Sequence, residues 1–392
     1  MPASNLIFVL LNASLFVEAL LYGLIVPVVP YYAGVLHADS GQLGLIFAMY
    51  SLALLLGSFP AGIACDRFGR RPVLLAGLVV LMVSTLLFAW VNNIWLLVLS
   101  RIIQGAAGAA IWTAGLAAAS AMFPREERGR RLGLMMAVTG LGTIAGPVFS
   151  GIVFSAWGYR ATFYVTALAI LPVFLAFLRL PLPEPERTAE GEEPGFKELF
   201  KSLGDSEIAM VMLLIIAGSY GFGMLEPLMP LRLFREFNLD SRAIGFFFGV
   251  LSLSYTIAQP LWGYASDRIG YRPVIIAGLA VTLLVTPALA LAPGIFYVYA
   301  AGSLFGIANC AMMTPCLPML AEHSENSGKE SYGRSFGLVN AAYSTGLLLG
   351  PALGGMVARE FSFLGAAAVY SLILLLIGAG VVRRFRKGAL AK

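Results

Sequence analysis

Charged side chains are scarce in this chain. Asp, Glu, Lys and Arg together make up 12% of its 392 residues, whereas a soluble domain carries about a quarter. Hydrophobic residues reach 59%, and the mean hydropathy is +0.84. So few charges cannot cover the surface of a water-soluble body of this size. We therefore expect an integral membrane protein whose surface mostly faces lipid.

Cysteine and histidine are also rare. The chain has three cysteines, Cys65, Cys310 and Cys316, and two histidines, His37 and His323. Their spacings match neither a disulfide framework nor a metal site, so no metal is expected. The sequence also lacks a nucleophile, base or metal constellation and a Walker sequence for ATP. It therefore predicts neither an enzyme nor a bound cofactor.

A basic stripe is missing as well, although the isoelectric point is about 9.1. The basic residues sit in short loops, so nucleic acid is not an expected partner. No Lys or Arg precedes the first apolar run. That run is too long and too rich in proline for a cleaved signal peptide.

Long apolar runs dominate what is present. A bilayer core needs about 20 apolar residues per helix, and the sequence predicts twelve such spans. They cover residues 5–33, 43–64, 73–91, 94–121, 132–155, 160–180, 208–233, 243–265, 273–292, 295–320, 335–358 and 363–382. We expect an all-α membrane protein with an N-terminal half at 1–180, a linker at 181–207, a C-terminal half at 208–383 and a basic tail at 384–392.

The basic residues divide the loops into two sets. Twenty of the 26 Lys and Arg lie in alternate loops and the tail, counting Arg179 at the edge of its span. The other set carries five, and Arg101 lies inside a span. By the positive-inside rule, the richer set and both termini are predicted to be cytoplasmic.

The stretch 181–207 is the only long polar segment. It is rich in Pro, Gly and Glu, as a linker is. Phe196, Leu199 and Phe200 alternate with charged residues, which also fits a short helix on the membrane surface. Both interpretations stay open.

The two halves repeat each other. Residues 60–79 match residues 261–280, and Pro27 and Pro30 match Pro227 and Pro230. The shared offset of about 200 residues predicts duplication of a six-helix unit. Duplicated halves are typical of alternating-access transporters, which bind substrate near the middle of the membrane.

The loop from Gly62 to Pro72, GIACDRFGRRP, joins the second and third spans. Its glycines allow a tight turn, and Asp66 can face the positive N-terminus of a helix. Its arginines can pair with acids or anionic lipid headgroups. A simple topology anchor would explain the loop equally well.

This loop resembles the signature G-x-x-x-D-R-x-G-R-R of the major facilitator superfamily, and the resemblance extends over the whole chain. It implies the major facilitator fold, with twelve transmembrane helices in two pseudo-symmetric six-helix halves. In that family the loop is a conformational latch. The latch role passes to Asp66, Arg67 and Arg70 and, in the second copy of the loop, to Asp267.

Two further motifs resemble those of the drug:proton antiporters. The fourth span reads Leu97-x3-Arg101-x2-Gln104-Gly105-x2-Gly108. The fifth contains Gly142-x3-Gly146-Pro147, and the eleventh repeats it as Gly346-x3-Gly350-Pro351. Glycines let helices touch backbone to backbone, and proline removes a helical hydrogen bond and bends a helix. Gly146, Pro147, Gly350 and Pro351 are therefore predicted helix-bending positions, although tight packing alone would explain the glycines.

Only Glu18, Arg101 and Glu226 are charged residues expected well inside the spans. A charge in lipid costs about 3 kcal/mol or more, so each is a functional candidate. Burial favours the protonated form of a carboxyl, and an acid that exchanges a proton can couple transport to a proton gradient. The alternative for each is a structural ion pair between helices.

The first and seventh spans, EALLYGLIVPVVP from Glu18 and GMLEPLMP from Gly223, resemble those of vesicular monoamine transporters and bacterial multidrug exporters. The resemblance implies that Glu226 and Glu18 bind amines or couple protons. It departs where a lysine is expected at Tyr50, and where acids are expected near Met313 and at Asn340. The long loop between the first two spans of vesicle proteins is absent, which favours a bacterial plasma membrane.

The same fold implies that the first, fourth, seventh and tenth spans line the substrate cavity, helped by their neighbours. Aromatic faces attract organic cations, and methionines adapt to varied shapes. The candidate lining residues are Tyr22, Tyr50, Trp112, Tyr220, Phe222, Tyr255, Asn309, Met312, Asn340 and Tyr343, of which about half are expected to be ordinary helix packing.

The leading hypothesis is a monomeric, proton-coupled antiporter in the plasma membrane that exports monoamines or lipophilic drugs. The runner-up is a proton-coupled exporter of a neutral metabolite or sugar, and a non-transporting sensor is an alternative from another class. Acids facing aromatic rings favour cations, whereas a pocket of Asn, Gln and Arg would favour sugars.

Overall fold

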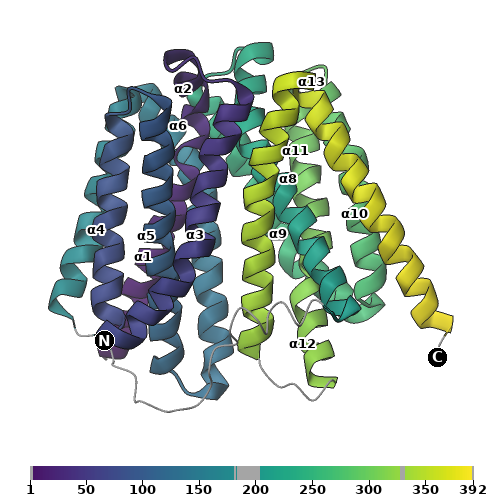
Figure 1. Ribbon diagram of the computed structural model, residues 1–392, viewed down its shortest axis with the longest axis horizontal. Coiled ribbons are helices and arrows are strands. Elements are labelled where there is room, and N and C mark those ends of the chain that lie inside the picture. Colours follow the sequence, from purple (N-terminus) through teal and green to yellow (C-terminus); the bar gives the residue numbers. More distant parts are fainter. Residues whose placement is uncertain (1–2, 181, 183–203, 327–331, 391–392) are drawn as a thin grey trace. The chain divides into compact units, whose positions relative to one another are not determined.

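The computed structural model describes residues 3–180, 182, 204–326 and 332–390, and every long element in these ranges is a helix (Figure 1). Most of the predicted linker, including its possible surface helix, lies outside the described residues. The helices of the N-terminal half are α1 (Ala3–Gly23), η1 (Val26–Val28), α2 (Val29–Val35), α3 (Ser40–Phe68), α4 (Arg70–Ala89), α5 (Ile94–Met122) and α6 (Arg125–Arg179). Those of the C-terminal half are α8 (Ser206–Phe237), α9 (Ser241–Ile269), α10 (Tyr271–Leu291), α11 (Ile295–Met313), α12 (Cys316–Asn326) and α13 (Tyr332–Leu390).

The chain forms two compact units. The first comprises Met1–Thr188 with Met229–Gly249, and the second comprises Ala189–Leu228 with Val250–Lys392. Inside the first unit α5 packs against α3 and α4, and α1 packs against α6. Inside the second, α10 packs against α11 and α13, and Figure 1 shows α10 and α13 side by side.

Ten helical segments in the described part of the chain are long and apolar enough to cross a membrane. Two of them, Glu127–Arg179 and Gly337–Arg384, contain 53 and 48 residues, far more than the roughly 20 that one crossing needs. Each contains a kink where two helices meet. The kink in α6 is at Gly158, with φ 80° and ψ 172°, and that in α13 is at Phe361 and Ser362.

The first predicted span is not one helix. Instead of running through residues 5–33, α1 ends at Gly23, and a turn and η1 lead into α2. Pro27 and Pro30 lie at the starts of η1 and α2, where their missing N–H groups cost nothing. The tenth predicted span likewise divides into α11 and α12 at a turn containing Pro315. In contrast, α8 continues through both Pro227 and Pro230.

The helices of the repeated Gly-Pro motif pack closely on the first helix of their half. In the first unit, a methyl group on Gly142 would lie 2.6 Å from the carbonyl oxygen of Phe16, and one on Gly146 would collide with that of Leu20. In the second unit, methyl groups on Gly346 and Gly350 would collide with the carbonyl oxygens of Ile216 and Tyr220 in α8. The motif thus brings backbones together, as its glycines predict.

The helix bends predicted at Pro147 and Pro351 are not seen in this structure. Both α6 and α13 continue through Pro147 and Pro351, and their non-helical residues lie elsewhere. The prolines instead contact a glycine of the neighbouring helix. A methyl group on Gly23 would lie 2.8 Å from Pro147 Cδ, and one on Gly223 would lie 2.8 Å from Pro351 Cδ. A bend at either proline during transport remains a prediction.

Candidate functional site

Glu18 in α1 is buried, with 2% of its surface exposed. The Tyr50 hydroxyl in α3 donates a hydrogen bond to Glu18 Oε1 over 2.5 Å. The Trp112 indole in α5 donates one to Glu18 Oε2 over 2.8 Å. An unpaired buried carboxylate would be costly, and these two donors offset part of the cost of its ionised form.

Gly108 in α5 leaves the room that this carboxylate occupies. A methyl group at Gly108 would lie 2.9 Å from Glu18 Oε1 and 3.1 Å from the Tyr50 hydroxyl oxygen. A contact this tight requires a neighbour to shift. The glycine therefore belongs to the Glu18 site, a role that the sequence motif alone did not assign to it.

Arg101 is fully buried at 0% exposure. Its Nη1 donates to Gln104 Oε1 over 2.8 Å and to the Tyr22 carbonyl oxygen over 3.4 Å. Aromatic rings surround its guanidinium, with Phe47 at 4.7 Å, Tyr50 at 5.5 Å, Tyr22 at 5.7 Å and Phe88 at 6.0 Å from the ring centroids. Cation–π attraction is stronger where water is excluded, so the rings offset part of the cost of burying the charge.

The predicted residues of the first unit therefore come together. Tyr22 and Tyr50 have ring centroids 4.7 Å apart. Tyr50 touches both charged groups, since its hydroxyl binds Glu18 and its ring lies against Arg101. Trp112 completes the group from α5. We call Glu18, Tyr22, Tyr50, Arg101 and Trp112 the Glu18 cluster.

Glu226 lies in α8, in the second unit. Its side chain is half-buried and therefore more exposed than that of Glu18. Tyr343 of α13 lies within electrostatic range of the Glu226 carboxyl and is itself 40% exposed. Asn340, about one helical turn before Tyr343, is also exposed. Glu226 and Tyr343 thus lie near each other, whereas a contact of Asn340 with the Glu226 carboxyl remains a prediction.

The other predicted residues of the second unit belong largely to its packing. Phe222 lies 5.4 Å from Tyr255 and 5.6 Å from Phe305, measured between ring centroids. Tyr220 stacks on Tyr370 at 5.3 Å. Asn309 and Met312 are fully buried. The Asn309 side chain donates a hydrogen bond to the Gly218 carbonyl oxygen over 3.1 Å.

The predicted latch loop Gly62–Pro72 is helical except for a sharp turn at Gly69, so that Asp66 and Arg67 lie at the end of α3 and Arg70 at the start of α4. Gly69 has φ 88° and the equivalent Gly270 has φ 84°, a region in which a side chain would be strained. Asp66, Arg67 and Asp267 are exposed, and Arg70 is half-buried. The latch role of these residues remains a prediction.

Two arginines have contacts that the sequence analysis missed. Arg71 donates hydrogen bonds to the carbonyl oxygens of Phe177 and Leu178 over 3.0 Å and 2.8 Å, which caps the C-terminal end of α6. Arg232, which the charge count assigned to a loop although it lies at the end of the predicted span 208–233, is in α8, is 6% exposed and pairs with Glu236 over 2.8 Å. The spacing Arg232-x3-Glu236, one helical turn, could have revealed the second contact.

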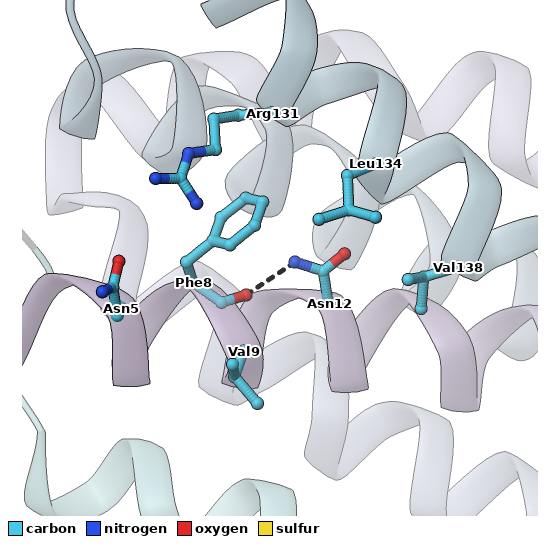
Figure 2. Close-up of a pocket in the computed structure, with 7 residues that line it drawn as sticks. All are labelled: Asn5, Phe8, Val9, Asn12, Arg131, Leu134 and Val138. Carbon is cyan, nitrogen blue, oxygen red and sulfur yellow. Dashed lines mark hydrogen bonds between the residues drawn. The ribbon is translucent and has the colours of Figure 1, made fainter. Parts of the chain in front are cut away.

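A groove of about 500 Å³ lies between α1 and α6, away from the predicted residues (Figure 2). In it the guanidinium of Arg131 lies 5.2 Å from the ring centroid of Phe8. Figure 2 shows the Asn12 amide turned toward the Phe8 carbonyl oxygen, to which it donates a hydrogen bond of 2.7 Å. The groove is lined by Asn5, Phe8, Val9, Asn12, Arg131, Leu134 and Val138.

Comparison with known proteins extends this picture. The family model of the Major Facilitator Superfamily matches residues 11–225 and again 211–389. The chain is 28% identical over 380 residues to the MFS-type transporter SLC18B1 of Mus musculus, covering 92% of this chain and 82% of that one. It is 25% identical over 334 residues to the chromaffin granule amine transporter of Homo sapiens, covering 84% of this chain and 62% of that one.

Solved structures show the same fold. A bacterial homologue of the human lysosomal transporter Spinster superposes with a TM-score of 0.84 at 15% identity, over 97% of this chain and 96% of that one. The nucleoside transporter NupG superposes with a TM-score of 0.80 at 12% identity, over 98% of this chain and 99% of that one. The resemblance stated from the signature loop is confirmed, and this multi-pass membrane chain belongs to the Major Facilitator Superfamily of transporters.

Proposed function

We propose that this transporter exchanges protons for small organic cations, monoamines or lipophilic drugs, and exports them by alternating access. The observation that carries the proposal is the contrast between its two intramembrane acids. Glu18 is buried and bound by two donors, whereas Glu226 is half-buried beside an exposed tyrosine. An accessible carboxylate next to an aromatic ring suits a cation, and an enclosed acid suits a proton.

The names of its relatives support this substrate class. The chromaffin granule amine transporter and a synaptic vesicular amine transporter of Rattus norvegicus are among them, the latter 24% identical over 326 residues. The cationic amine would be bound by Glu226, with Tyr343 and Asn340 contributing to its site. Glu18 would carry the coupled proton, and Arg101 would keep the Glu18 site electrostatically balanced.

We infer twelve membrane crossings for this transporter. The kinks at Gly158 and at Phe361 and Ser362 each divide a helix of more than 50 residues into two. Each half is then long enough for one crossing, at 1.5 Å per residue. With the loop charges, this topology puts both termini in the cytoplasm and suits a plasma-membrane exporter.

The proposal predicts how binding depends on pH. A carboxylate that accepts either a proton or a cation makes the two compete, so amine affinity falls as the pH falls. Glu226→Gln is neutral at every pH and should bind amines about tenfold or more weakly, because it lacks the charge-assisted contact, with no pH dependence from this group. Glu18→Gln should bind nearly as the parent does but lose proton-driven flux.

The measurement is equilibrium binding of dopamine and of tetraphenylphosphonium to purified protein at pH values from about 5 to 9, a range that brackets a carboxyl perturbed by burial. Glu360→Gln is the matched control, because that side chain is 66% exposed. If Glu226→Gln binds both cations like the parent throughout, Glu226 is not the cation site. Saturable binding of glucose with no cation binding would instead favour export of a neutral solute.

A further inference from the structure

The internal repeat shows that the Glu18 site exists in only one half. Gly105 packs against the Tyr50 carbonyl oxygen, and Gly306 packs in the same way against that of Leu251. Position 108 therefore corresponds to 309, and the prolines of the first and seventh spans make position 18 correspond to 218.

In the second unit these equivalent places are filled differently. The place of the acid is taken by Gly218, and that of Gly108 by Asn309, which donates a hydrogen bond to the Gly218 carbonyl oxygen. The place of Trp112 is taken by Met313, whose Cγ would lie 2.6 Å from a methyl group on Gly218. At these positions, all of which the structure describes, the acid, the space beside Gly108 and the two donors occur in the first unit and not in the second, so this combination is a specialised site and not a feature of the fold.

The two donors to Glu18 differ in what they can do when a proton arrives. The Trp112 indole can only donate a hydrogen bond, whereas the Tyr50 hydroxyl can donate or accept one. A proton on Oε2 would face the indole N–H of Trp112, which cannot accept a hydrogen bond. A proton on Oε1 would face the Tyr50 oxygen, which can accept a hydrogen bond once its own hydrogen turns away.

We propose that Tyr50 is the positioning residue for the transported proton, and that its hydroxyl reverses its hydrogen bond with Glu18 in each cycle. In the ionised state Tyr50 donates to Oε1. When a proton from water forms an O–H bond at Oε1, that group donates to the Tyr50 oxygen instead. The proton later leaves to water and the original hydrogen bond returns. This inference rests on the proposed function and extends it.

Of the two described side chains that donate hydrogen bonds to the carboxyl, Tyr50 is the one that can reverse its bond. The titratable or charged side chains near it are Tyr22 on α1 itself, Tyr50 on α3 and Arg101 on α5. The segment 135–150 of α6, which packs on α1, contains no titratable residue. Arg101 lies against the Tyr50 ring. Its electrostatic interaction with Tyr50 therefore changes when the hydroxyl reverses its hydrogen bond.

The test uses Tyr50→Phe, which keeps the ring beside Arg101 and removes only the hydroxyl. The first readout is the infrared band of the protonated carboxyl in purified protein, assigned by its loss in Glu18→Gln and titrated with pH. The ionised acid loses a stronger hydrogen bond than the protonated acid does, so the midpoint should move up by about one pH unit. Tyr297→Phe, on an exposed side chain, is the control and should leave the midpoint unchanged.

The second readout is proton-driven cation flux in proteoliposomes. Tyr50→Phe should lower it by about tenfold or more, whereas Tyr297→Phe, on the exposed control side chain, should leave it unchanged. An unchanged midpoint in Tyr50→Phe, or equal flux losses in the two variants, would overturn the proposal. The infrared titration needs no substrate, so its outcome is independent of whether cations are the cargo.

Discussion

At the scale of single residues, His323 near the end of α12 lies between two carboxylates at the start of α8. Its Nε2 is 2.7 Å from Asp205 Oδ2, and its Nδ1 is 2.8 Å from Glu207 Oε2. Burial acts to raise the pKa of the Asp205 carboxyl. The hydrogen bonds from His323 and from the Glu207 backbone N–H outweigh it, so that the pKa is lowered overall. The group thus ties α12 to the beginning of α8.

This tie has a defined pH dependence. A carboxyl whose folded-state pKa is lowered stabilises the protein above its unfolded pKa of about 3.9, and the effect is lost as the pH falls through the folded value. Asp205→Asn should therefore reduce the free energy of unfolding by at most about 1 kcal/mol at pH 7, since the pair is partly exposed. Thermal unfolding in detergent at pH 7 and near pH 3 checks this, with Glu360→Gln as control. An equal loss at both pH values would contradict the assignment.

At the scale of elements, the contact between α1 and α6 depends on glycines of the Gly-Pro motif. A methyl group at Gly146 collides with the Leu20 carbonyl oxygen, whereas one at Gly140, in the same helix, meets nothing within 4 Å. Both glycines lie in α6, but Gly146 contacts another helix and Gly140 does not. Alanine at the two positions therefore distinguishes the effect of helix packing from that of helix propensity.

Gly146→Ala should lower the free energy of unfolding by about 1–3 kcal/mol, because the helices must move apart. Gly140→Ala should be neutral or stabilise by about 0.5–1 kcal/mol, because alanine favours a helix. Thermal unfolding of the two purified variants, with cation flux measured in parallel, makes the comparison. Equal stability of the two would show that this helix contact is loose.

At the scale of the whole molecule, transport requires that the two halves change their arrangement. The segment Gly62–Pro72 is the part of the sequence with the clearest family resemblance, and its Asp66 is exposed at the end of α3. An acid that meets a positive helix end in one state of the cycle contributes about 0.3–2 kcal/mol to that state. Its loss would change the balance between states without disturbing the cargo site.

Asp66→Asn should therefore reduce flux while expression and cation affinity stay near those of the parent. Flux into proteoliposomes and equilibrium binding, measured on the same preparation, separate the two effects. Asp267→Asn, in the second copy of the loop, should have the same effect to a smaller degree. Parental flux in Asp66→Asn would remove the latch role from this residue.

The sequence predicted the membrane class, the family, the internal repeat and the residues of the Glu18 cluster. It could do so because lipid demands long apolar runs and makes every charge inside them conspicuous. It did not locate the ends of α1 at Gly23 and of α11 at Met313, where proline acts differently from proline inside α8. It also ended the seventh span at residue 233, whereas α8 continues to Phe237, because an apolar run does not show where a helix continues past the membrane core.

The sequence by itself determined that Glu18, Tyr50, Arg101 and Trp112 lie within the spans, because hydrophobic periods and charge rarity are local properties of the chain. Only the tertiary structure decided that Tyr50 and Trp112 donate to opposite oxygens of Glu18, and that Gly108 leaves the slot between them. These residues are 32 to 94 positions from Glu18 along the chain. Hydrogen bonds between such distant residues depend on how helices are rotated and packed, which no local pattern specifies.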